Sequence, residues 1–119
     1  MPPSGGTEPR RVAVPKGVFV AITNPVSSDR EEEYTDWYEN THMREVLGVE
    51  GFVSVKRFKA IDGESPKFMA VYEVDVDDLS SVVPLLGQAG AQGKLTQSDA
   101  SDRGATKMRV YELVAEAAK

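Results

Sequence analysis

The segment that decides the fold reads YTDWYENTHMREVLGVEGF and spans residues 34–52. Its aromatic and polar side chains recur at the spacing of one face of an α-helix. The residues on this stripe are Tyr34, Trp37, Tyr38, Thr41, His42 and Glu45. The side chains of Glu39 and Arg44 point elsewhere. The segment therefore predicts a helix that turns an aromatic, partly polar face toward the inside of the protein.

The residues around this segment indicate where the helix begins and ends. Ser28 and Glu31 have the Ser-x-x-Glu spacing of a capping box, and acidic residues 31–33 favour a helix N-terminus because the helix dipole attracts negative charge there. Gly48 can adopt the left-handed conformation at which many helices end. We expect one helix over residues 28–47.

Strand patterns flank this helix and follow it. Residues 18–23 (VFVAIT) are apolar and rich in β-branched side chains, which predicts a strand covered on both faces or nearly so. Residues 52–59 and 67–74 alternate in character on either side of an Asp-Gly turn, as an antiparallel hairpin does. Residues 107–114 alternate like a last strand.

A second helix is expected between the hairpin and the last strand. Its regular part starts near Ser80 or Ser81, because Pro84 is tolerated only in a first turn. Glycines weaken it, so it depends on packing. The side chains expected to pack are Val82, Val83, Leu85 and Leu86. Residues 94–106 are polar and without pattern, which predicts a loop and a candidate lid.

The order of elements, βαββαβ, is that of a ferredoxin-like fold. Right-handed crossovers place both helices on one face of a four-stranded antiparallel sheet. The opposite face would then expose a large apolar surface, and a second copy of the chain can cover it with the same face. We expect residues 17–119 to form one α+β domain that pairs as a homodimer.

The segment over residues 34–52 resembles the dimeric α+β barrel superfamily and is nearest to EthD-like proteins. The resemblance rests on the W-Y-x-x-x-H-x-x-E pattern that ends at Glu45, on the Gly51-Phe52 pair and on Arg57 in the next strand, and it covers roughly residues 17–78. It implies a homodimer whose sheets pack face to face, with a mostly apolar pocket between sheet and helices in each subunit. Members include cofactor-free oxygenases, cyclases, dehydratases, lyases and haem-handling proteins, so the reaction must be inferred from the site.

Composition disfavours several classes of function. The formal net charge is -5 and the basic residues are scattered, so nucleic acid is not expected as a partner. With no cysteine and 1 histidine, the chain is not expected to bind zinc, and we predict no metal and no cofactor; the alternative left open is a haem held by His42. No apolar run approaches a membrane span, which predicts a cytoplasmic protein without membrane contact. Residues 1–16 are expected to form a disordered arm.

The candidate catalytic residues are His42, Tyr38, Tyr72 and Glu45. His42 is the only side chain whose unshifted pKa lies near neutrality, so it is the candidate for moving a proton, and the competing interpretation is a half-exposed structural histidine. We expect Glu45 to orient His42 by hydrogen bonding, or to act as the base itself if burial raises its pKa. Either tyrosine is expected to steady an enolate oxygen.

The candidate substrate-binding residues are Trp37, Tyr34, Phe52 and Arg57. Aromatic rings at helical spacing stack against planar ligands, but they also form ordinary core, which is the competing interpretation for Trp37. For Arg57 the competing interpretation is a salt bridge at the surface or at an interface.

Three functions remain open on these residues. The first is a cofactor-independent enzyme that uses one histidine as general acid and base on a small, apolar, aromatic or polyketide-like carbonyl compound, as a cyclase, dehydratase or lyase. The second is a ligand-binding or accessory protein that uses the same pocket without chemistry. The third is a cofactor-free monooxygenase, in which a substrate carbanion reacts directly with oxygen.

Overall fold

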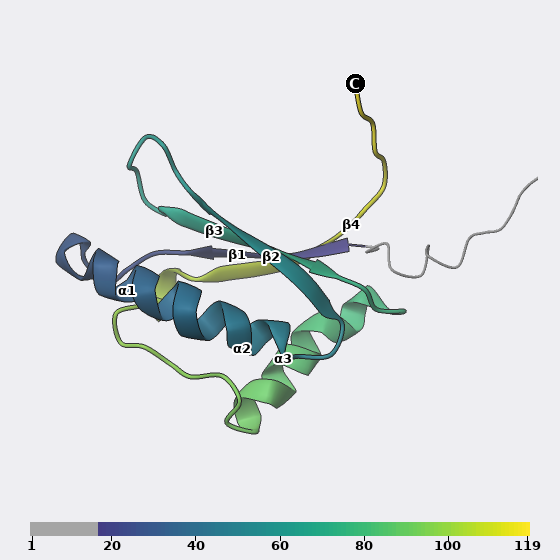
Figure 1. Ribbon diagram of the computed structural model, residues 1–119, viewed down its shortest axis with the longest axis horizontal. Coiled ribbons are helices and arrows are strands. Elements are labelled where there is room, and N and C mark those ends of the chain that lie inside the picture. The colour runs from purple at the N-terminus through teal and green to yellow at the C-terminus, as the bar shows by residue number, and fades with distance from the viewer. Residues whose placement is uncertain (1–16) are drawn as a thin grey trace, which may run out of the picture.

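The computed structural model describes residues 17–119, which form a 4-stranded antiparallel sheet with helices on one side of it (Figure 1). The strands are β1 (Gly17–Thr23), β2 (Phe52–Lys59), β3 (Phe68–Val74) and β4 (Lys107–Glu112), in the order β2-β3-β1-β4. The helices are α1 (Glu31–Trp37), α2 (Met43–Leu47) and α3 (Val82–Ala91). The predicted ferredoxin-like arrangement is confirmed. The arm predicted over residues 1–16 lies outside the described residues.

The predicted first helix is one continuous helical segment with an irregular middle. A 3₁₀ turn (Ser28–Arg30) leads into α1, and a π-helical turn (Tyr38–His42) joins α1 to α2. Residues five apart are neighbours on a π turn, whereas residues four apart are neighbours on an α turn. Turns of the π kind are frequent at functional sites. The sequence pattern did not predict this turn, which decides how the aromatic stripe faces the sheet.

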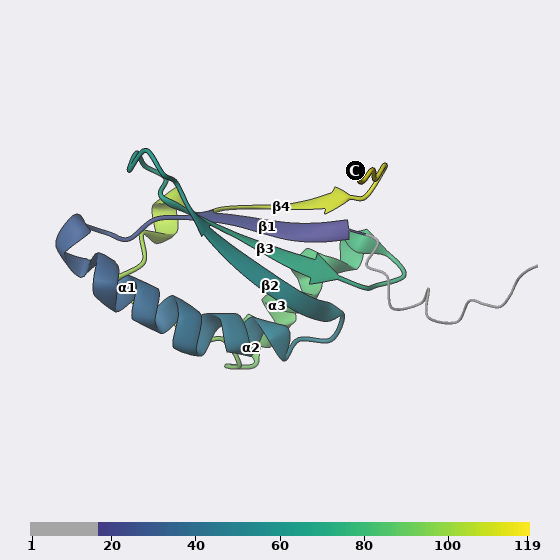
Figure 2. The same cartoon turned by 45° about the horizontal axis from the view of Figure 1, so that its top comes forward.

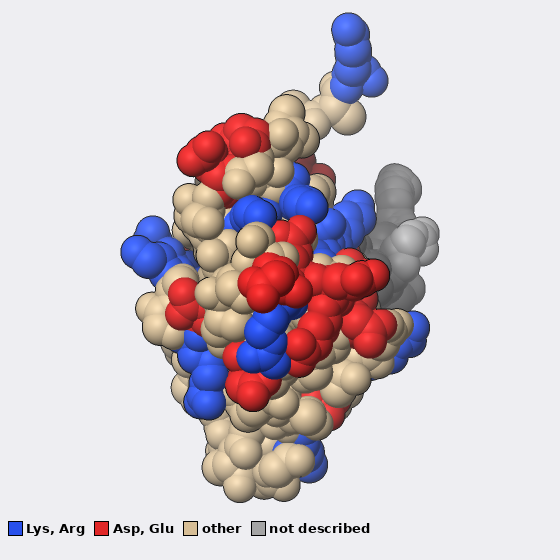
Figure 3. Space-filling view, turned by 90° about the vertical axis from the view of Figure 1, so that its left-hand side faces the viewer, with Lys and Arg blue, Asp and Glu red and all other residues tan. Residues whose placement is uncertain are grey.

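The predicted capping box is not formed. The residue that precedes the first turn is Ser27 and not Ser28, and the Ser27 side chain makes no capping hydrogen bond. The Glu31 carboxylate instead pairs with the ammonium groups of Lys67 and Lys59 at 2.9 Å each, and these bonds hold the pKa of Glu31 below its ordinary value. Figure 3 views this end of the molecule and shows acidic side chains set among basic ones. The charges that were interpreted as helix capping therefore also tie α1 to the sheet.

The hairpin of β2 and β3 forms as predicted, with one irregularity. The pairing register shifts between Phe52 and Ser54, which makes Val53 the extra residue of a β-bulge. Val53 is 50% exposed and does not share a sheet face with Val55 and Arg57, although strict alternation along the strand would place all three on one face. The bulge lets Phe52 pack into the core while the rest of β2 keeps its own alternation.

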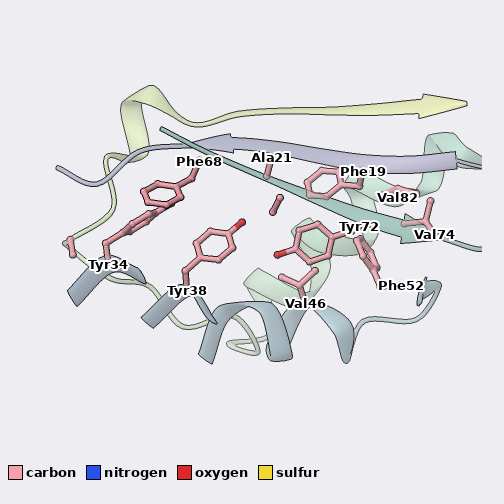
Figure 4. Close-up of a cluster of buried hydrophobic side chains, with 12 residues drawn as sticks. Phe19, Ala21, Tyr34, Tyr38, Val46, Phe52, Phe68, Tyr72, Val74 and Val82 are labelled. Carbon is pink, nitrogen blue, oxygen red and sulfur yellow. The ribbon is translucent and has the colours of Figure 1, made fainter. Parts of the chain in front are cut away.

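The core lies between the helices and one face of the sheet (Figure 4). Its buried residues are Phe19, Ala21, Tyr34, Tyr38, Val46, Phe52, Phe68, Ala70, Tyr72, Val74, Val82 and Ala100. Every second residue of β1 contributes, because successive side chains of a strand point to opposite faces. The rings of Phe19, Phe52 and Tyr72 have centroids 5.8, 5.9 and 6.0 Å apart, which is the spacing of favourable aromatic pairs.

The opposite face of the sheet carries no helix in the part of the chain that the structure describes (Figure 2). The β1 side chains on that face, Val18, Val20 and Ile22, are only half-buried, so within one chain β1 is covered on one face and not on both. Phe58 of β2 and Tyr111 of β4 are 47% and 44% exposed there. The sheet thus presents a partly apolar surface to its surroundings.

The second helix begins where the sequence predicted. A 3₁₀ turn (Leu79–Ser81) precedes α3, and the Asp78 carboxylate caps it by accepting a 3.0 Å hydrogen bond from the Ser80 backbone N–H. Pro84 falls in the first turn of α3, and Val82 is fully buried, as expected. β4 ends at Glu112, earlier than predicted. None of the helices in residues 17–119 is long and apolar enough to cross a lipid bilayer.

Candidate functional site

A hollow of about 410 Å³ opens between the helices, the sheet and the loop that joins α3 to β4. Trp37, Tyr38, His42 and Tyr72, all predicted as site residues, line it. Much of the remaining wall consists of apolar side chains from β1, α2, α3 and β4. The volume and the apolar lining are those of a small-molecule site. The helix stripe and the sheet therefore enclose the pocket that the family resemblance implied.

The π turn places the imidazole of His42 against the indole of Trp37. The two rings are stacked, with centroids 4.8 Å apart and planes at 26°. The ring of Tyr38 meets the same imidazole edge-on at 4.9 Å. In a regular α-helix His42 would neighbour Tyr38, four residues earlier, and the π turn adds the contact with Trp37, five residues earlier. The irregular turn thus gathers three predicted site residues into one cluster.

The surroundings of His42 favour the neutral form of its imidazole. Burial lowers its pKa because desolvation disfavours the charged form, and the neighbouring Glu45 carboxylate offsets only part of this effect. The Nδ1 atom is buried and has no hydrogen-bond partner within residues 17–119. A neutral imidazole in a ligand-sized hollow has the protonation state that a general base requires.

Two tyrosine hydroxyls converge inside the protein. Figure 4 shows the oxygen atoms of Tyr38 and Tyr72 pointing toward one another between the helix and the sheet. Burial raises the pKa of both phenols, that of Tyr72 to about 12, so both hydroxyls stay protonated and can donate hydrogen bonds. The Tyr72 hydroxyl is buried and makes no hydrogen bond of ordinary geometry in the described part of the chain, although the Tyr38 hydroxyl lies close enough to influence its pKa. Such groups are rare in folded proteins and often mark a functional site.

Glu45 was predicted to orient His42 by hydrogen bonding, but its carboxylate is hydrogen-bonded to Thr96 instead. Its carboxylate accepts hydrogen bonds from the backbone N–H of Thr96 at 2.7 Å and from the Thr96 hydroxyl at 2.6 Å. These bonds hold the pKa of Glu45 below its ordinary value, which is the opposite of what a carboxylate base at neutral pH requires. Glu45 therefore anchors the loop that follows α3, and the interpretation as an orienting group or base is corrected.

The loop between α3 and β4 crosses the helix side of the molecule (Figure 1) and is held at further points. Arg30 donates a 2.6 Å hydrogen bond to the Asp99 carboxylate. The backbone N–H of Val26 donates to the Ala100 carbonyl at 2.8 Å. The predicted loop thus forms one wall of the hollow, while its closure as a lid stays a prediction.

Two of the predicted substrate-binding aromatics do not line the hollow. Tyr34 is fully buried, and its hydroxyl donates a hydrogen bond to the Thr23 hydroxyl. Phe52 packs edge-on against Phe19 and Tyr72 in the core. Both residues belong to the packing around the site, because the aromatic stripe is wider than the pocket that it borders.

Arg57 does not line the hollow either. Its side chain is only 7% exposed, and Nη1 lies 2.9 Å from the Glu39 carboxylate. The guanidinium lies 4.0 Å from the ring centroid of Phe68 and 4.8 Å from that of Tyr38, which is the geometry of a cation–π contact. The salt-bridge interpretation fits this residue, which braces the aromatic cluster from the side of the sheet edge.

Polar residues of the loop line the hollow without having been predicted. They are Gln97, Ser101, Arg103 and Thr106. In the sequence they lie in a stretch without periodicity, which predicts a loop but not which of its side chains turn inward. Their orientation depends on the anchors to Glu45 and Arg30, residues that are distant in the sequence.

Few side chains of this site are suited to hold a metal. Within residues 17–119 no group of three or more histidine, aspartate or glutamate side chains gathers closely enough to bind an ion. Among the residues that line the hollow, His42 alone offers an imidazole nitrogen, which metals bind well. Any metal in this hollow would therefore have to arrive with most of its ligands already in place.

Comparison with solved structures places the fold among known ones. The chain is similar to MhuD from Mycobacterium tuberculosis, a heme-degrader with two hemes bound in its active site, with a TM-score of 0.62 and 11% identity over 86% of this chain and 99% of that one. It is similar to a proposed monooxygenase from Shewanella loihica PV-4, with a TM-score of 0.54 and 16% identity over 86% and 98% of the two chains. It is also similar to an EthD family protein from Bacillus halodurans C-125, with a TM-score of 0.53 and 19% identity over 82% and 99%.

No protein-family model and no curated protein matches the sequence. At identities this low, similarity of structure shows the fold alone. The chain has a ferredoxin-like α+β fold that it shares with these proteins, and the resemblance to EthD-like proteins is confirmed at the level of the fold.

Proposed function

We propose that the hollow binds a small, largely apolar carbonyl compound. We further propose that the imidazole of His42 removes a proton from this compound and returns it, without a cofactor. The observation that carries this proposal is the half-buried imidazole of His42, which lines a cavity of ligand size and has a buried Nδ1 atom without a hydrogen-bond partner within the described chain. The apolar wall suits an aromatic or polyketide-like ligand. Support for a small-molecule site comes from the heme-degrader of the same fold.

In the proposed reaction the imidazole of His42 first acts as a base. It accepts the proton from the carbon next to the carbonyl group, the C–H electron pair becomes the second bond of the enolate, and the carbonyl electrons move onto oxygen. A hydroxyl of Tyr38 or Tyr72 donates a hydrogen bond to that oxygen. The imidazolium then returns the proton. Aldol cyclisation and dehydration begin with this enolate, and retro-aldol cleavage passes through it.

A test of the proton transfer does not require the natural substrate. Aromatic ketones such as β-tetralone exchange the protons next to the carbonyl group for deuterium in deuterium oxide, and NMR follows the exchange. We expect the protein to accelerate exchange for at least one member of a ketone panel, and His42→Gln to lower that rate about 100-fold or more. Asn40→Ala, at an exposed position of the same helical segment, is the matched control and should leave the rate unchanged.

The same assay separates the alternatives. If ketones bind but wild type and His42→Gln exchange them equally slowly, the proton-transfer proposal fails and the site is a binding site without this chemistry. Oxygen uptake with the same ketones would favour a cofactor-free monooxygenase. A titration with haemin that lowers the rate of exchange and shifts the Soret band in wild type but not in His42→Gln would favour haem handling.

We also propose that the protein is a homodimer in which the open sheet faces pack together. The face opposite the helices carries half-buried Val18, Val20 and Ile22, together with exposed Phe58 and Tyr111. Removing such a surface from water is favourable, and in a twofold dimer the same face of each copy covers the other.

Sedimentation velocity at micromolar protein concentration tests the dimer. We expect a dimer for the wild type and a monomer for Val71→Lys, which places a charge in the middle of the open face opposite Val20. Glu64→Gln, in the exposed hairpin turn, raises the net charge by the same single unit away from that face. A monomeric wild type, or equal dissociation by both variants, contradicts the proposed interface.

A further inference from the structure

The hollow has two chemically different ends. Apolar side chains such as Val46, Leu86 and Met108 border it on the side of the helices and the sheet. The loop between α3 and β4 supplies polar side chains instead: Gln97, Ser101, Arg103 and Thr106. A ligand that fills the hollow therefore contacts an apolar wall formed by the helices and the sheet, and a polar rim formed by the loop between α3 and β4.

Among the residues of 17–119 that line the hollow, Arg103 alone has a permanently charged side chain. None of the ion pairs within 4.0 Å in the described chain involves it. Asp99 and Asp102 border an adjoining hollow, which shares Trp37, Gln97, Ser101 and Arg103 with the first one, but the Asp99 carboxylate is engaged with Arg30 at 2.6 Å. The guanidinium of Arg103 thus keeps its hydrogen-bond donors available to a ligand.

The backbone that carries Arg103 is fixed. The N–H of Asp102 donates to the Asn24 carbonyl at 2.9 Å, and the N–H of Thr106 donates to the Arg103 carbonyl at 3.3 Å. Arg103 opens a 3₁₀ turn (Arg103–Ala105) that leads directly into β4. The backbone of the rim is therefore positioned before a ligand binds, so that only the exposed Arg103 side chain has to be ordered when it engages an anionic group.

We infer that the ligand of this hollow is an amphipathic carboxylic acid, with an apolar body against the aromatic wall and its carboxylate on Arg103. An isolated carboxylate is strongly disfavoured in an apolar cavity unless it is paired, and no other side chain lining the hollow has a permanent positive charge. The guanidinium matches a carboxylate with two parallel hydrogen bonds. This inference rests on the proposed function in taking the hollow as the ligand site, and it orients the ligand with its acid group at the rim.

The inference is testable through the only tryptophan of the chain, Trp37, which lines the hollow, so that its fluorescence reports binding there. Adamantane carboxylate and adamantane methanol are matched probes, with the same apolar cage and different charge, and neither absorbs where tryptophan does. We expect wild type to bind the carboxylate about fivefold or more tightly than the alcohol, and Arg103→Gln to abolish that preference. Arg103→Lys should keep part of it, and Arg44→Gln, at an exposed position on α2, should keep all of it.

Equal affinity of wild type for the two probes overturns the carboxylate assignment, and so does a preference that survives in Arg103→Gln. The proposed proton transfer is judged separately, by deuterium exchange on neutral ketones. Loss of the acid preference in Arg103→Gln together with unchanged exchange in His42→Gln would support the ligand class and refute the reaction. A measured preference for the alcohol in every variant would refute the ligand class and leave the reaction standing.

Discussion

Replacing Tyr72 by phenylalanine is expected to stabilise the fold while impairing the site. The Tyr72 hydroxyl is buried without a hydrogen-bond partner in the described chain, and burial raises its pKa to about 12. In the unfolded chain the same hydroxyl is hydrated. The folded state therefore carries a desolvation penalty that the substitution removes.

The magnitude follows from that penalty. A buried polar group without a partner costs about 1 to 3 kcal/mol, and the void left by one oxygen atom offsets part of the gain. We expect Tyr72→Phe to raise the free energy of unfolding by about 0.5 to 1.5 kcal/mol. For a domain of this size, each kcal/mol corresponds to an increase of about 4 to 8 °C in Tm.

Tyr34 supplies a matched control of opposite sign. Its hydroxyl is equally buried but donates a hydrogen bond to the Thr23 hydroxyl, so Tyr34→Phe removes a bond and leaves a buried acceptor without a donor. We expect this variant to lose about 1 to 2 kcal/mol. Urea denaturation of both variants and wild type, at one protein concentration so that dimerisation cannot contribute to the difference, measures the two effects.

The reasoning is refuted if Tyr72→Phe is destabilised as much as Tyr34→Phe. That result would mean that the Tyr72 hydroxyl is hydrogen-bonded in solution, with Tyr38 as the nearest candidate because their oxygens point toward one another. If the stability gain is found, the ketone exchange rate of the same variant shows whether the hydroxyl serves the reaction. A loss of rate is expected when the hydroxyl steadies the enolate oxygen.

Two further predictions concern the groups beside the imidazole. Burial holds the pKa of His42 in the folded protein below its unfolded value of about 6.5. Between these two pKa values the unfolded chain binds more protons than the folded one, so the free energy of unfolding falls as the pH is lowered through this range. The slope is at most about 1.4 kcal/mol per pH unit. Denaturation at pH 7.5 and about 5.5 should show a smaller loss for His42→Gln than for wild type, and equal losses would contradict the assigned shift. Glu45→Gln should loosen the loop because it weakens the hydrogen bonds to Thr96. We expect hydrogen exchange at the Thr96 amide to become at least about tenfold faster. Glu50→Gln, at an exposed position, is the control. Unchanged exchange would mean that this anchor does not hold the loop.

The order of helices and strands, the hairpin and the aromatic stripe of the first helix were determined by the sequence alone. These features depend on periodicity, which records locally which face of an element is buried. The stripe also carried the single histidine inward, where it lines the hollow. The placement of Trp37, Tyr38 and Tyr72 around that hollow follows from the same alternation and helical spacing.

Only the tertiary structure decided the chemistry of the pocket wall. The π turn that stacks His42 on Trp37 and the bulge at Val53 are choices between backbone hydrogen-bond patterns that local sequence does not distinguish. The Glu45 carboxylate bonds to Thr96, 51 residues away, and so anchors the loop whose polar side chains line the hollow. Contacts between residues so distant in the chain exist only after folding, and no periodicity within either segment encodes them.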